Sequence, residues 1–406
     1  MSSLLSFPRE KIRVLLLEGI HDSAAEAFVQ RGYTHVDRSA VLPPPEELHD
    51  VRLLGIRSRT HIDESVLEAL PKLMAIGCFC IGTNQIDLAA AAHRGVPVFN
   101  APHSNTRSVA ELVIGLTIML QRGTFGKSRA VHAGEWPKTA AGSREVRGKT
   151  IGIVGYGHIG SQVSILAEAL GLHVVYFDIE PKLPLGNARA VDSLEELLET
   201  ADVVTLHVPL TEATDRMMDA GNIARMQPGA FLINTSRGPV VDQDALADAL
   251  KDGRVGGTAV DVFPEEPASN DAGLVSPLRA IDDAILTPHV AGSTLEAQEK
   301  IGLEVSHKLV GYSDRGSTVG TVNFPQLSLS PHTRAHRILH IHRNVPGMLQ
   351  QINSALAEEN INVLAQHLET ANSTGYVVLD IEKVASTRLF ARLKQIEGTI
   401  RARILY

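Results

Sequence analysis

Two series of short apolar segments that alternate with helical patterns constrain the fold of this 406-residue chain more than any other feature. The longer series starts at Thr150. Its apolar runs predict strands at 150–155, 173–178, 202–208, 230–236, 258–263 and 284–290. Buried strands joined by crossover helices form a parallel sheet with helices on both faces. Six such strands in succession predict one complete doubly wound domain.

The shorter series occupies the N-terminal part of the chain. Its pattern predicts strands at 12–18, 53–57, 73–81 and 96–99, and helices at 23–31, 64–70 and 88–94. A longer apolar helix is expected at 108–121, where the two series meet. The N-terminal series therefore predicts a second parallel sheet covered by helices.

The C-terminal part follows a different pattern. A helix is expected at 295–312, followed by a connector at 312–331 that is richer in Ser, Gly and Pro. The segments after it predict strand 337–343, helix 346–358, strands 362–369 and 376–382, helix 386–396 and strand 399–406. This β-α-β-β-α-β order is that of the ferredoxin-like motif. The expected fold class is therefore α/β, with two doubly wound parallel sheets and a small ferredoxin-like domain.

Composition narrows the choice of partners. Lys and Arg number 38 and Asp and Glu number 46, so the net charge is −8, and no long basic run is present. Nucleic acid and anionic membranes are therefore poor candidates. No apolar run is long enough to predict a membrane span. Cys78 and Cys80 lie in an apolar stretch and are expected to be reduced core thiols, which favours a cytoplasmic protein.

A glycine-rich turn follows the first strand of the longer series. Gly155, Gly157 and Gly160 form the pattern GxGxxG at the start of an expected helix, which is typical of dinucleotide binding. Asp178 ends the next expected strand, where a carboxylate accepts hydrogen bonds from ribose hydroxyls and repels a 2′-phosphate. These residues predict NAD rather than NADP as the cofactor.

Polar residues at the ends of later strands predict a catalytic site. Arg237, Asp261, Glu266 and His289 all lie where parallel strands end, so we expect them to converge near the nicotinamide. His289 would move the alcohol proton of a 2-hydroxy acid, Glu266 would raise the His289 pKa, and Arg237 would hold the substrate carboxylate. A metal site is not expected, because His289 has no His or Cys partner at zinc-ligand spacing.

These motifs resemble the D-isomer-specific 2-hydroxyacid dehydrogenases. The segments that carry the resemblance are GYGHIG (155–160), MQPGAFLINTSRGPVVD (226–242), AVDVFPEEP (259–267) and LTPHVAGST (286–294). The resemblance implies that Arg237, Glu266 and His289 are catalytic. It also implies cofactor contacts at Gly155, Gly157, His158, Ile159, Gly160, Asp178, Thr235, Ser236, Arg237, Asp261, His289, Val290, Ala291 and Gly292.

The similarity is closer to those members that oxidise 3-phosphoglycerate to 3-phosphohydroxypyruvate and carry a C-terminal ACT domain. It covers nearly the whole chain, through segments such as IRSRTHI (56–62) and TIRARILY (399–406). It implies a Rossmann-like NAD domain at 105–292, inserted in a flavodoxin-like substrate domain formed by 1–104 and 293–332. The ACT domain would occupy 335–406.

The resemblance also places the substrate. A phosphate needs cations, and Arg57 and Arg59 lie on one face of an extended segment after an expected strand. Ser58, Asn105 and Thr106 would add neutral donors. In the family, Lys138 reaches toward the substrate site, and Trp136 lies in a subunit contact of a homotetramer.

The ACT domain implies an effector. In the family, two such domains pair edge to edge and bind L-serine at the seam, and the matching residues are His342, Asn344 and Asn362. Some relatives have a Gly-Gly hinge before this domain. The corresponding stretch here, 330–334, contains Pro331, so we expect a stiffer hinge and serine inhibition of uncertain strength.

Two alternatives share these features. A reductase of another 2-oxo acid, such as 2-oxoglutarate, would use the same catalytic residues. An NAD-sensing scaffold or corepressor would keep the fold, but the serine-type effector domain argues against it.

Overall fold

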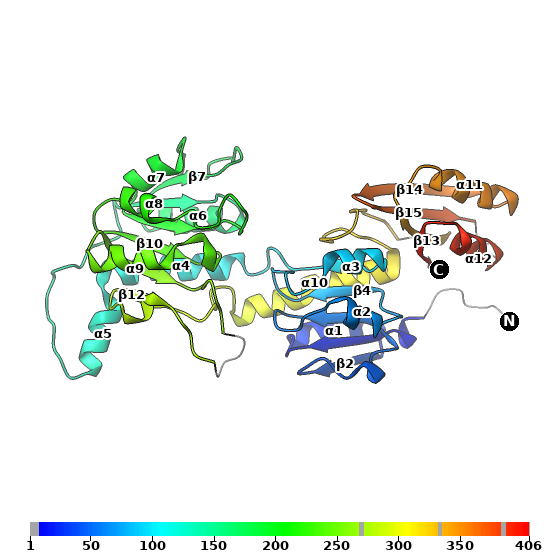
Figure 1. The fold of residues 1–406 in the computed structure, drawn as a ribbon, viewed down its shortest axis with the longest axis horizontal. Coiled ribbons are helices and arrows are strands. Elements are labelled where there is room, and N and C mark those ends of the chain that lie inside the picture. Colours follow the sequence, from blue (N-terminus) through cyan, green and yellow to red (C-terminus); the bar gives the residue numbers. More distant parts are fainter. Residues whose placement is uncertain (1–7, 268–271, 332–334, 383–386, 406) are drawn as a thin grey trace. The chain divides into compact units, whose positions relative to one another are not determined.

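A computed structural model describes residues 8–267, 272–331, 335–382 and 387–405 (Figure 1). Contacts within the chain define two compact units. Unit 1 consists of residues 1–104 and 298–406, and unit 2 consists of residues 105–297. Unit 2 is therefore inserted in unit 1 along the sequence.

Unit 2 is built on a parallel sheet with the order β12-β11-β10-β9-β6-β7-β8. Its strands are β6 (Thr150–Val154), β7 (His173–Phe177), β8 (Arg189–Ala190), β9 (Val203–Leu206), β10 (Ala230–Asn234), β11 (Val255–Val260) and β12 (Ala284–Leu286). The six strands expected from the apolar pattern are confirmed. Strand β8 was not expected, because it has two exposed residues and no apolar run.

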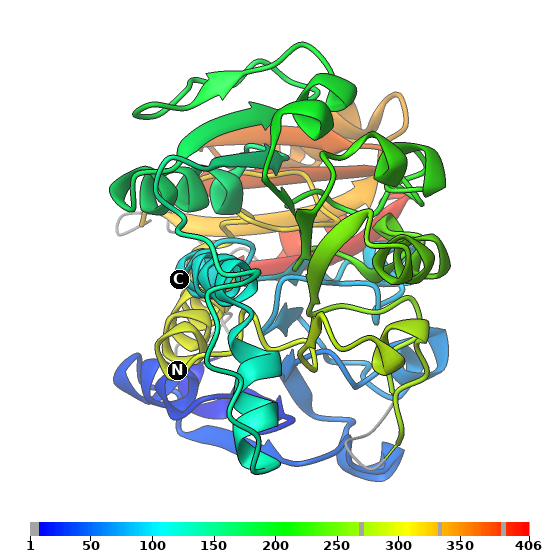
Figure 2. The ribbon, with the colours of Figure 1, turned by 90° about the vertical axis from the view of Figure 1, so that its left-hand side faces the viewer.

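Helices cover both faces of this sheet, as Figure 2 shows. One face packs on α4 (Thr106–Arg122) and α6 (His158–Ala169), and the other on α7 (Leu194–Thr200), α8 (Ala220–Arg225) and α9 (Gln243–Lys251). Successive residues of β6 alternate between the two cores, which is the period-two pattern of a strand buried on both sides.

The N-terminal sheet of unit 1 is also parallel and has the order β2-β1-β3-β4-β5. Its elements are β1 (Arg13–Leu17), α1 (Asp22–Gln30), β2 (His35–Ser39), β3 (Val51–Ile56), α2 (Glu64–Glu68), β4 (Ala75–Cys78), α3 (Leu88–His93) and β5 (Val98–Phe99). This order is that of the flavodoxin-like doubly wound fold. Strand β2 was not expected from the sequence, because it is a polar edge strand with no buried residue.

Helix α10 (Leu295–Arg315) covers one face of this sheet together with α1. Gly77 of β4 makes the close approach possible, since a Cβ atom there would lie 2.6 Å from Val305 and 2.8 Å from Leu309. The N-terminal sheet is thus covered by a helix that follows unit 2 in the sequence.

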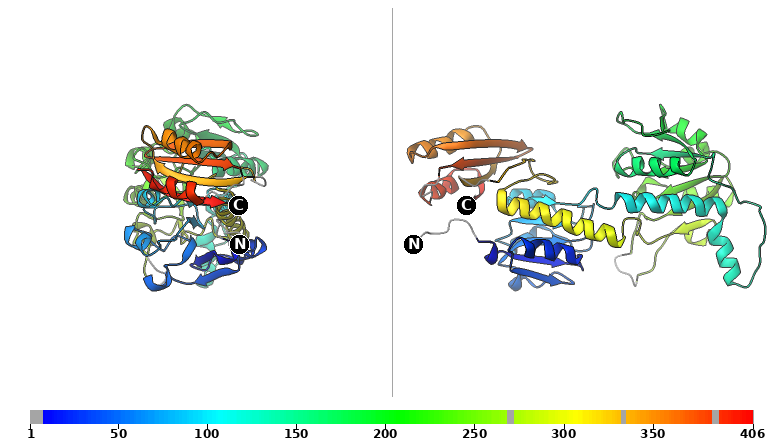
Figure 3. Two further views of the ribbon diagram at one scale, coloured as in Figure 1. Left: turned by 90° about the vertical axis from the view of Figure 1, so that its right-hand side faces the viewer. Right: turned by 180° about the vertical axis from the view of Figure 1, so that it is seen from behind.

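The C-terminal part of unit 1 is an antiparallel sheet with the order β14-β15-β13-β16 (Figure 3). Its elements are β13 (His336–Arg343), α11 (Met348–Glu358), β14 (Val363–Ala371), β15 (Thr374–Ile381), α12 (Thr387–Gln395) and β16 (Thr399–Leu405). The ferredoxin-like order expected from the sequence is confirmed. Helices α11 and α12 pack on one face, and Phe324, Leu327 and Leu329 of the connector pack on the other.

Arg337 of β13 ties this sheet to the preceding segment. Its guanidinium forms two 2.7 Å bonds to Asp380 and donates to the carbonyls of Arg315 and Ser330, at 3.0 and 2.8 Å. The expected hinge at 330–334 lies partly outside the described residues, since 332–334 are not described. Among the described helices, none is long and apolar enough to span a membrane.

Candidate active site

The glycine-rich turn joins β6 to α6 as the sequence predicts. Gly155 has a φ of +91°, and a Cβ atom there would lie 2.5 Å from the His207 carbonyl oxygen. At Gly160 a Cβ atom would lie 2.2 Å from the Gly155 carbonyl, so both positions require glycine. At Gly157 a Cβ atom would enter open space, which leaves the backbone accessible to a pyrophosphate. The N-terminus of α6 then offers N–H groups to that anion.

Asp178 is fixed beside this turn. One carboxylate oxygen accepts the Tyr156 N–H at 2.8 Å, and the other accepts the Glu180 N–H at 2.9 Å. Each oxygen retains acceptor capacity for a ribose hydroxyl. Lys182, the cation that follows, pairs with Glu180 at 2.5 Å. This arrangement fits the unmodified ribose of NAD.

Two buried polar atoms also fit a cofactor. The Thr235 hydroxyl and the Asn105 side-chain carbonyl are buried and have no hydrogen-bond partner among the described residues. Buried polar atoms are normally paired in proteins, so these two, one directly after β10 and one directly before α4, have capacity for a ligand. Asn105 also lies against the 289–292 turn, since a Cβ atom on Gly292 would lie 2.2 Å from its amide nitrogen.

His289 and Glu266 form the expected acid-base pair. The distance from His289 Nδ1 to Glu266 Oε2 is 2.8 Å, and both side chains are partly exposed. The Glu266 hydrogen bond raises the pKa of His289 against the opposing effect of burial. Burial is the largest single influence and raises the pKa of Glu266, but the hydrogen bond and charge of His289, the Phe263 N–H and the charge of Arg237 together lower it. Because Nδ1 is bonded to Glu266, Nε2 is the ring nitrogen left for proton transfer.

Arg237 is held close to this pair by its neighbours. Its charge lowers the pKa of both His289 and Glu266, although it is not the largest influence on either. Gly238 brings the two loops together, because a Cβ atom there would lie 2.0 Å from the Phe263 carbonyl carbon. Asn234 shapes the turn by accepting the Ser236 N–H at 3.0 Å and donating to the Arg237 carbonyl at 2.9 Å. We did not predict the role of Asn234, although an Asn two residues before Ser is a signal of such a turn.

Asp261 supports the His289 turn. Its buried carboxylate accepts the Thr287 hydroxyl at 2.6 Å and the N–H groups of Val290 and Ala291, both at 2.9 Å. His289 itself has a φ of +55°, the left-handed region that non-glycine residues seldom adopt. These three donors occupy most of the acceptor capacity of the Asp261 carboxylate. In the structure Asp261 therefore contacts the protein backbone and Thr287. Its predicted cofactor contact stays a prediction.

The residues predicted for the substrate lie in both units. Arg57, Ser58 and Arg59 follow β3 in unit 1, whereas Asn105 begins α4 in unit 2. Lys138 lies in an exposed segment of unit 2, six residues after α5 (Thr124–His132). Their common role in substrate binding therefore stays a prediction.

The predicted effector residues do not meet within one chain. His342 is buried at the end of β13 and pairs in register with Gly375. The backbone N–H of Asn344 donates to the Ser373 carbonyl at 2.8 Å, and its side-chain amide donates to the Asn372 carbonyl at 3.4 Å. Asn362 instead donates to Glu382 at 3.1 Å, beside the His336 end of β13. Six residues of strand separate the two ends, which is about 20 Å. A site that uses all three would need a second copy.

The fold and this site define a nicotinamide-dependent dehydrogenase of 2-hydroxy acids. Two family models match the chain: "D-isomer specific 2-hydroxyacid dehydrogenase, NAD binding domain" at 114–291, and "AHAS small subunit-like ACT domain" at 338–401. Among solved structures, a D-lactate dehydrogenase from Aquifex aeolicus in complex with NAD and lactic acid is 26% identical, with a TM-score of 0.66. That similarity covers 77% of this chain and 100% of the other.

Curated relatives extend the similarity over the full length. The D-3-phosphoglycerate dehydrogenase of Haemophilus influenzae is 54% identical over 100% of both chains. That of Escherichia coli K12 is 54% identical over 99% of both, and that of Dictyostelium discoideum 46% over 100% of both. The chain belongs to the D-isomer-specific 2-hydroxyacid dehydrogenases, which use NAD. Within them its place is in the family of D-3-phosphoglycerate dehydrogenases.

Proposed function

We propose that this chain oxidises 3-phospho-D-glycerate to 3-phosphohydroxypyruvate with NAD, as the first step of L-serine biosynthesis. The hydrogen-bonded pair of His289 and Glu266, close enough to Arg237 for its charge to affect both pKa values, carries this proposal. The full-length relatives of 46–54% identity bear the name of this enzyme. The name of the relatives is the basis for the proposed substrate, and the catalytic residues of the site are the basis for the proposed hydride and proton transfer.

Each residue has a defined role in the proposed reaction. His289 Nε2 accepts the proton of the substrate 2-hydroxyl, and Glu266 stabilises the imidazolium that results. Arg237 holds the substrate carboxylate with its planar guanidinium. NAD, when bound, accepts the hydride from C2. In the reverse reaction the same imidazolium returns its proton to the 2-oxo oxygen.

The phosphate end of the substrate is assigned to unit 1. Arg57 and Arg59 provide two cations at the end of β3, with Ser58 between them, and Asn105 and Lys138 add donors from unit 2. Because the chain has a net charge of −8, attraction of a phosphorylated acid depends on such local cations.

The test of the proposed function is NADH formation from 3-phospho-D-glycerate by the purified full-length chain. We expect kcat/KM with this acid to exceed that with 2-hydroxyglutarate, and NAD to be preferred over NADP. A chain that oxidised 2-hydroxyglutarate but not 3-phospho-D-glycerate would contradict the proposed substrate. A chain that bound NAD without turnover of either acid would favour the scaffold alternative.

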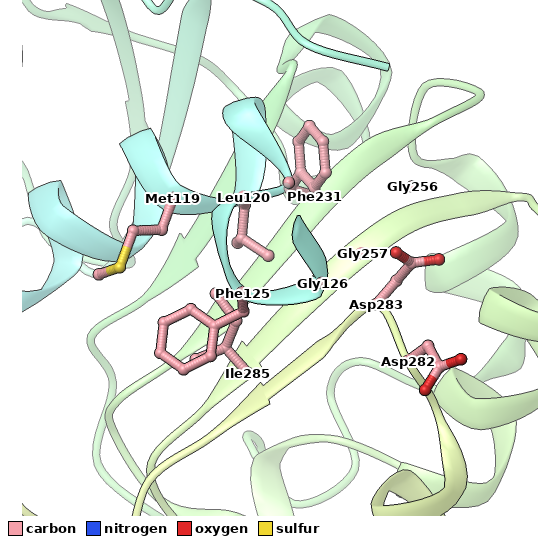
Figure 4. A pocket seen from close by; sticks show the side chains of 11 residues that line it. Met119, Leu120, Phe125, Gly126, Phe231, Gly256, Gly257, Asp282, Asp283 and Ile285 are labelled. Carbon is pink, nitrogen blue, oxygen red and sulfur yellow. The ribbon is translucent and has the colours of Figure 1, made fainter. Parts of the chain in front are cut away.

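We also propose a homotetramer. A small hollow of about 50 Å³ lies on unit 2 between α4, α5 and the β12 edge. Its lining includes the apolar residues Met119, Leu120, Phe125, Phe231 and Ile285 and the carboxylates Asp282 and Asp283 (Figure 4). Phe125, Val131 and Trp136 expose 51%, 47% and 79% of their surfaces nearby in the sequence. Large apolar side chains exposed along one segment are typical of a subunit contact.

L-serine is the proposed effector of the C-terminal sheet. Strand β14 is an edge strand with Leu364 and Leu368 exposed, so pairing of two copies along it would cover apolar surface. Such pairing supplies His342 and Asn344 from one copy and Asn362 from the other.

Serine is therefore expected to inhibit the enzyme. Initial rates of NADH formation, measured at fixed NAD while serine is varied, should fall at or below millimolar serine. An Asn362→Ala variant should lose this inhibition and keep its uninhibited rate, because Asn362 lies outside the proposed catalytic site. Rates that do not change at millimolar serine would overturn the effector assignment.

A further inference from the structure

A buried carboxylate lies beneath the two arginines that follow β3. Glu18 comes directly after β1, and 3% of its side chain is exposed. It has a φ of +58°, and Gly19 next to it has a φ of +64°. This left-handed pair turns the chain at the carboxyl end of the sheet and directs the Glu18 side chain toward the neighbouring strand β3.

The Glu18 carboxylate binds the backbone of the substrate loop, which we define as residues 57–60. Its Oε1 accepts the N–H groups of Arg57 at 3.2 Å and Thr60 at 2.9 Å, and its Oε2 accepts the N–H of Arg59 at 3.0 Å. Buried Gln85 donates to the Arg57 carbonyl at 2.6 Å. The backbone of the substrate loop is therefore held on its donor side by one side chain and on its acceptor side by another.

The two guanidinium groups of the substrate loop are less constrained than its backbone. The Arg59 side chain is 68% exposed, and its Nε forms an ion pair with Glu18 at 3.8 Å, which is too long for a hydrogen bond. Across the residues that the structure describes, the Arg57 guanidinium forms no ion pair. The carboxylate thus hydrogen-bonds the amides of the loop and forms only one long ion pair with its cations, so the guanidinium N–H groups can bind an anionic ligand.

Only a carboxylate satisfies this arrangement. Three N–H donors converge on the two oxygens of Glu18, and an ionised carboxylate is an acceptor at both. A glutamine in the same place would direct its own NH₂ group at one of these donors. Burial raises the pKa of Glu18, but the bonds from Thr60 and from the loop amides outweigh burial, and the pKa lies below its usual range.

We propose that Glu18 is a positioning residue for the substrate: it orders residues 57–60 so that Arg57 and Arg59 present their charges to the phosphate of the acid. The inference rests on the proposed function, which supplies the phosphorylated substrate. Two effects of Glu18 have opposite signs. Its negative charge repels an anion, whereas its hydrogen bonds preorganise the two cations that bind it.

The sign of a change in KM separates these effects. In Glu18→Gln the charge is lost but the size is kept, so simple electrostatics lowers KM for 3-phospho-D-glycerate, whereas loss of positioning raises it. We expect KM for this acid to rise about tenfold or more, because charged hydrogen bonds to the loop are lost. KM for NAD should stay within about twofold, because the NAD residues lie in unit 2.

The matched control is Glu26→Gln. Glu26 is exposed on α1 of the same unit, so this variant makes the same change of charge without touching the substrate loop. Both variants are assayed as the full-length chain, with thermal unfolding measured alongside. A smaller fraction of folded protein lowers the measured rate by the same factor at every substrate concentration. It therefore lowers the apparent kcat and leaves KM unchanged.

The outcomes are distinct. A KM for 3-phospho-D-glycerate that is unchanged or lower in Glu18→Gln, with an active wild type, overturns the positioning role. Absence of turnover by the wild type contradicts the proposed function instead. Should Glu18→Gln fail to fold, Glu18→Asp replaces it: the charge is kept but the shorter side chain cannot reach all three donors. A raised KM is again expected, and an unchanged or lowered one overturns the proposal.

Discussion

Replacement of His289 by alanine is expected to lower kcat for oxidation of 3-phospho-D-glycerate by a factor between about 10² and 10⁴. The imidazole is the group placed to take the hydroxyl proton, and in this variant the proton must pass to water. Binding of NAD should be retained, because Asp178 and the glycine-rich turn are held by Tyr156, Glu180 and close backbone packing rather than by His289. Initial rates of NADH formation measure the first quantity, and NADH fluorescence titration measures the second.

A Glu266→Gln variant tests whether His289 acts through its imidazole. The hydrogen bond from Glu266 raises the pKa of His289, so its loss lowers that pKa. Oxidation needs the neutral imidazole and therefore increases as pH rises through the pKa; the midpoint of this increase should move to lower pH in Glu266→Gln. The reductive reaction needs the imidazolium, and the pH at which it declines should move in the same direction.

These two variants together can contradict the assignment. If His289→Ala retains a rate close to that of the wild type, proton transfer by His289 is wrong. If Glu266→Gln lowers the rate without moving either pH midpoint, Glu266 supports the fold of its loop rather than the ionisation of His289.

Replacement of Arg237 by alanine is expected to reduce kcat/KM for the acid by about two orders of magnitude or more. Removal of one partner from a desolvated charge pair costs about 2–5 kcal/mol, and about 1.4 kcal/mol corresponds to tenfold. Arg237→Lys should recover only part of this loss, since an ammonium group cannot bind a carboxylate through two parallel bonds. Steady-state kinetics with the acid varied at saturating NAD measure both variants.

Arg225→Ala is the control for this change. Arg225 is a half-exposed arginine of the same unit that pairs with Glu199 on the surface, so its loss removes one positive charge away from the site. We expect kcat/KM to change by less than about twofold. Equal losses in Arg225→Ala and Arg237→Ala would mean that the net charge of unit 2, and not the carboxylate contact, governs binding of the acid.

Much of the fold could be predicted from hydrophobic patterns because its strands are buried on both faces. Apart from the short exposed strand β8, the strands of unit 2 are continuous apolar runs, and each was expected within a few residues of its place. Strand β2 could not be predicted from hydrophobic pattern, because its sequence HVDRS has no buried face. Its pairing with β1 depends on backbone hydrogen bonds at a sheet edge, which leave no signal in side-chain pattern.

The part of the site that was predictable from sequence is the part whose chemistry requires a particular residue type. The pairing of His289 with Glu266 follows from the need for a proton acceptor and its stabilising anion, and the structure places them 2.8 Å apart. Residues whose side chains hydrogen-bond the backbone of a distant loop were not predictable in the same way. Glu18 binds amides 39 to 42 positions away in the chain, and only the tertiary fold brings these together.

The insertion of unit 2 has a consequence for synthesis of the chain on the ribosome. Residues 1–104 emerge first, but α10, which covers one face of their sheet, follows only after the 193 residues from 105 to 297. At a synthesis rate of roughly 5–20 residues per second, α10 follows about 10–40 s after the residues of the sheet that it covers. Unit 2, whose sequence is continuous, can complete its core in that interval. The N-terminal sheet thus keeps part of this apolar face exposed to solvent while unit 2 is being made.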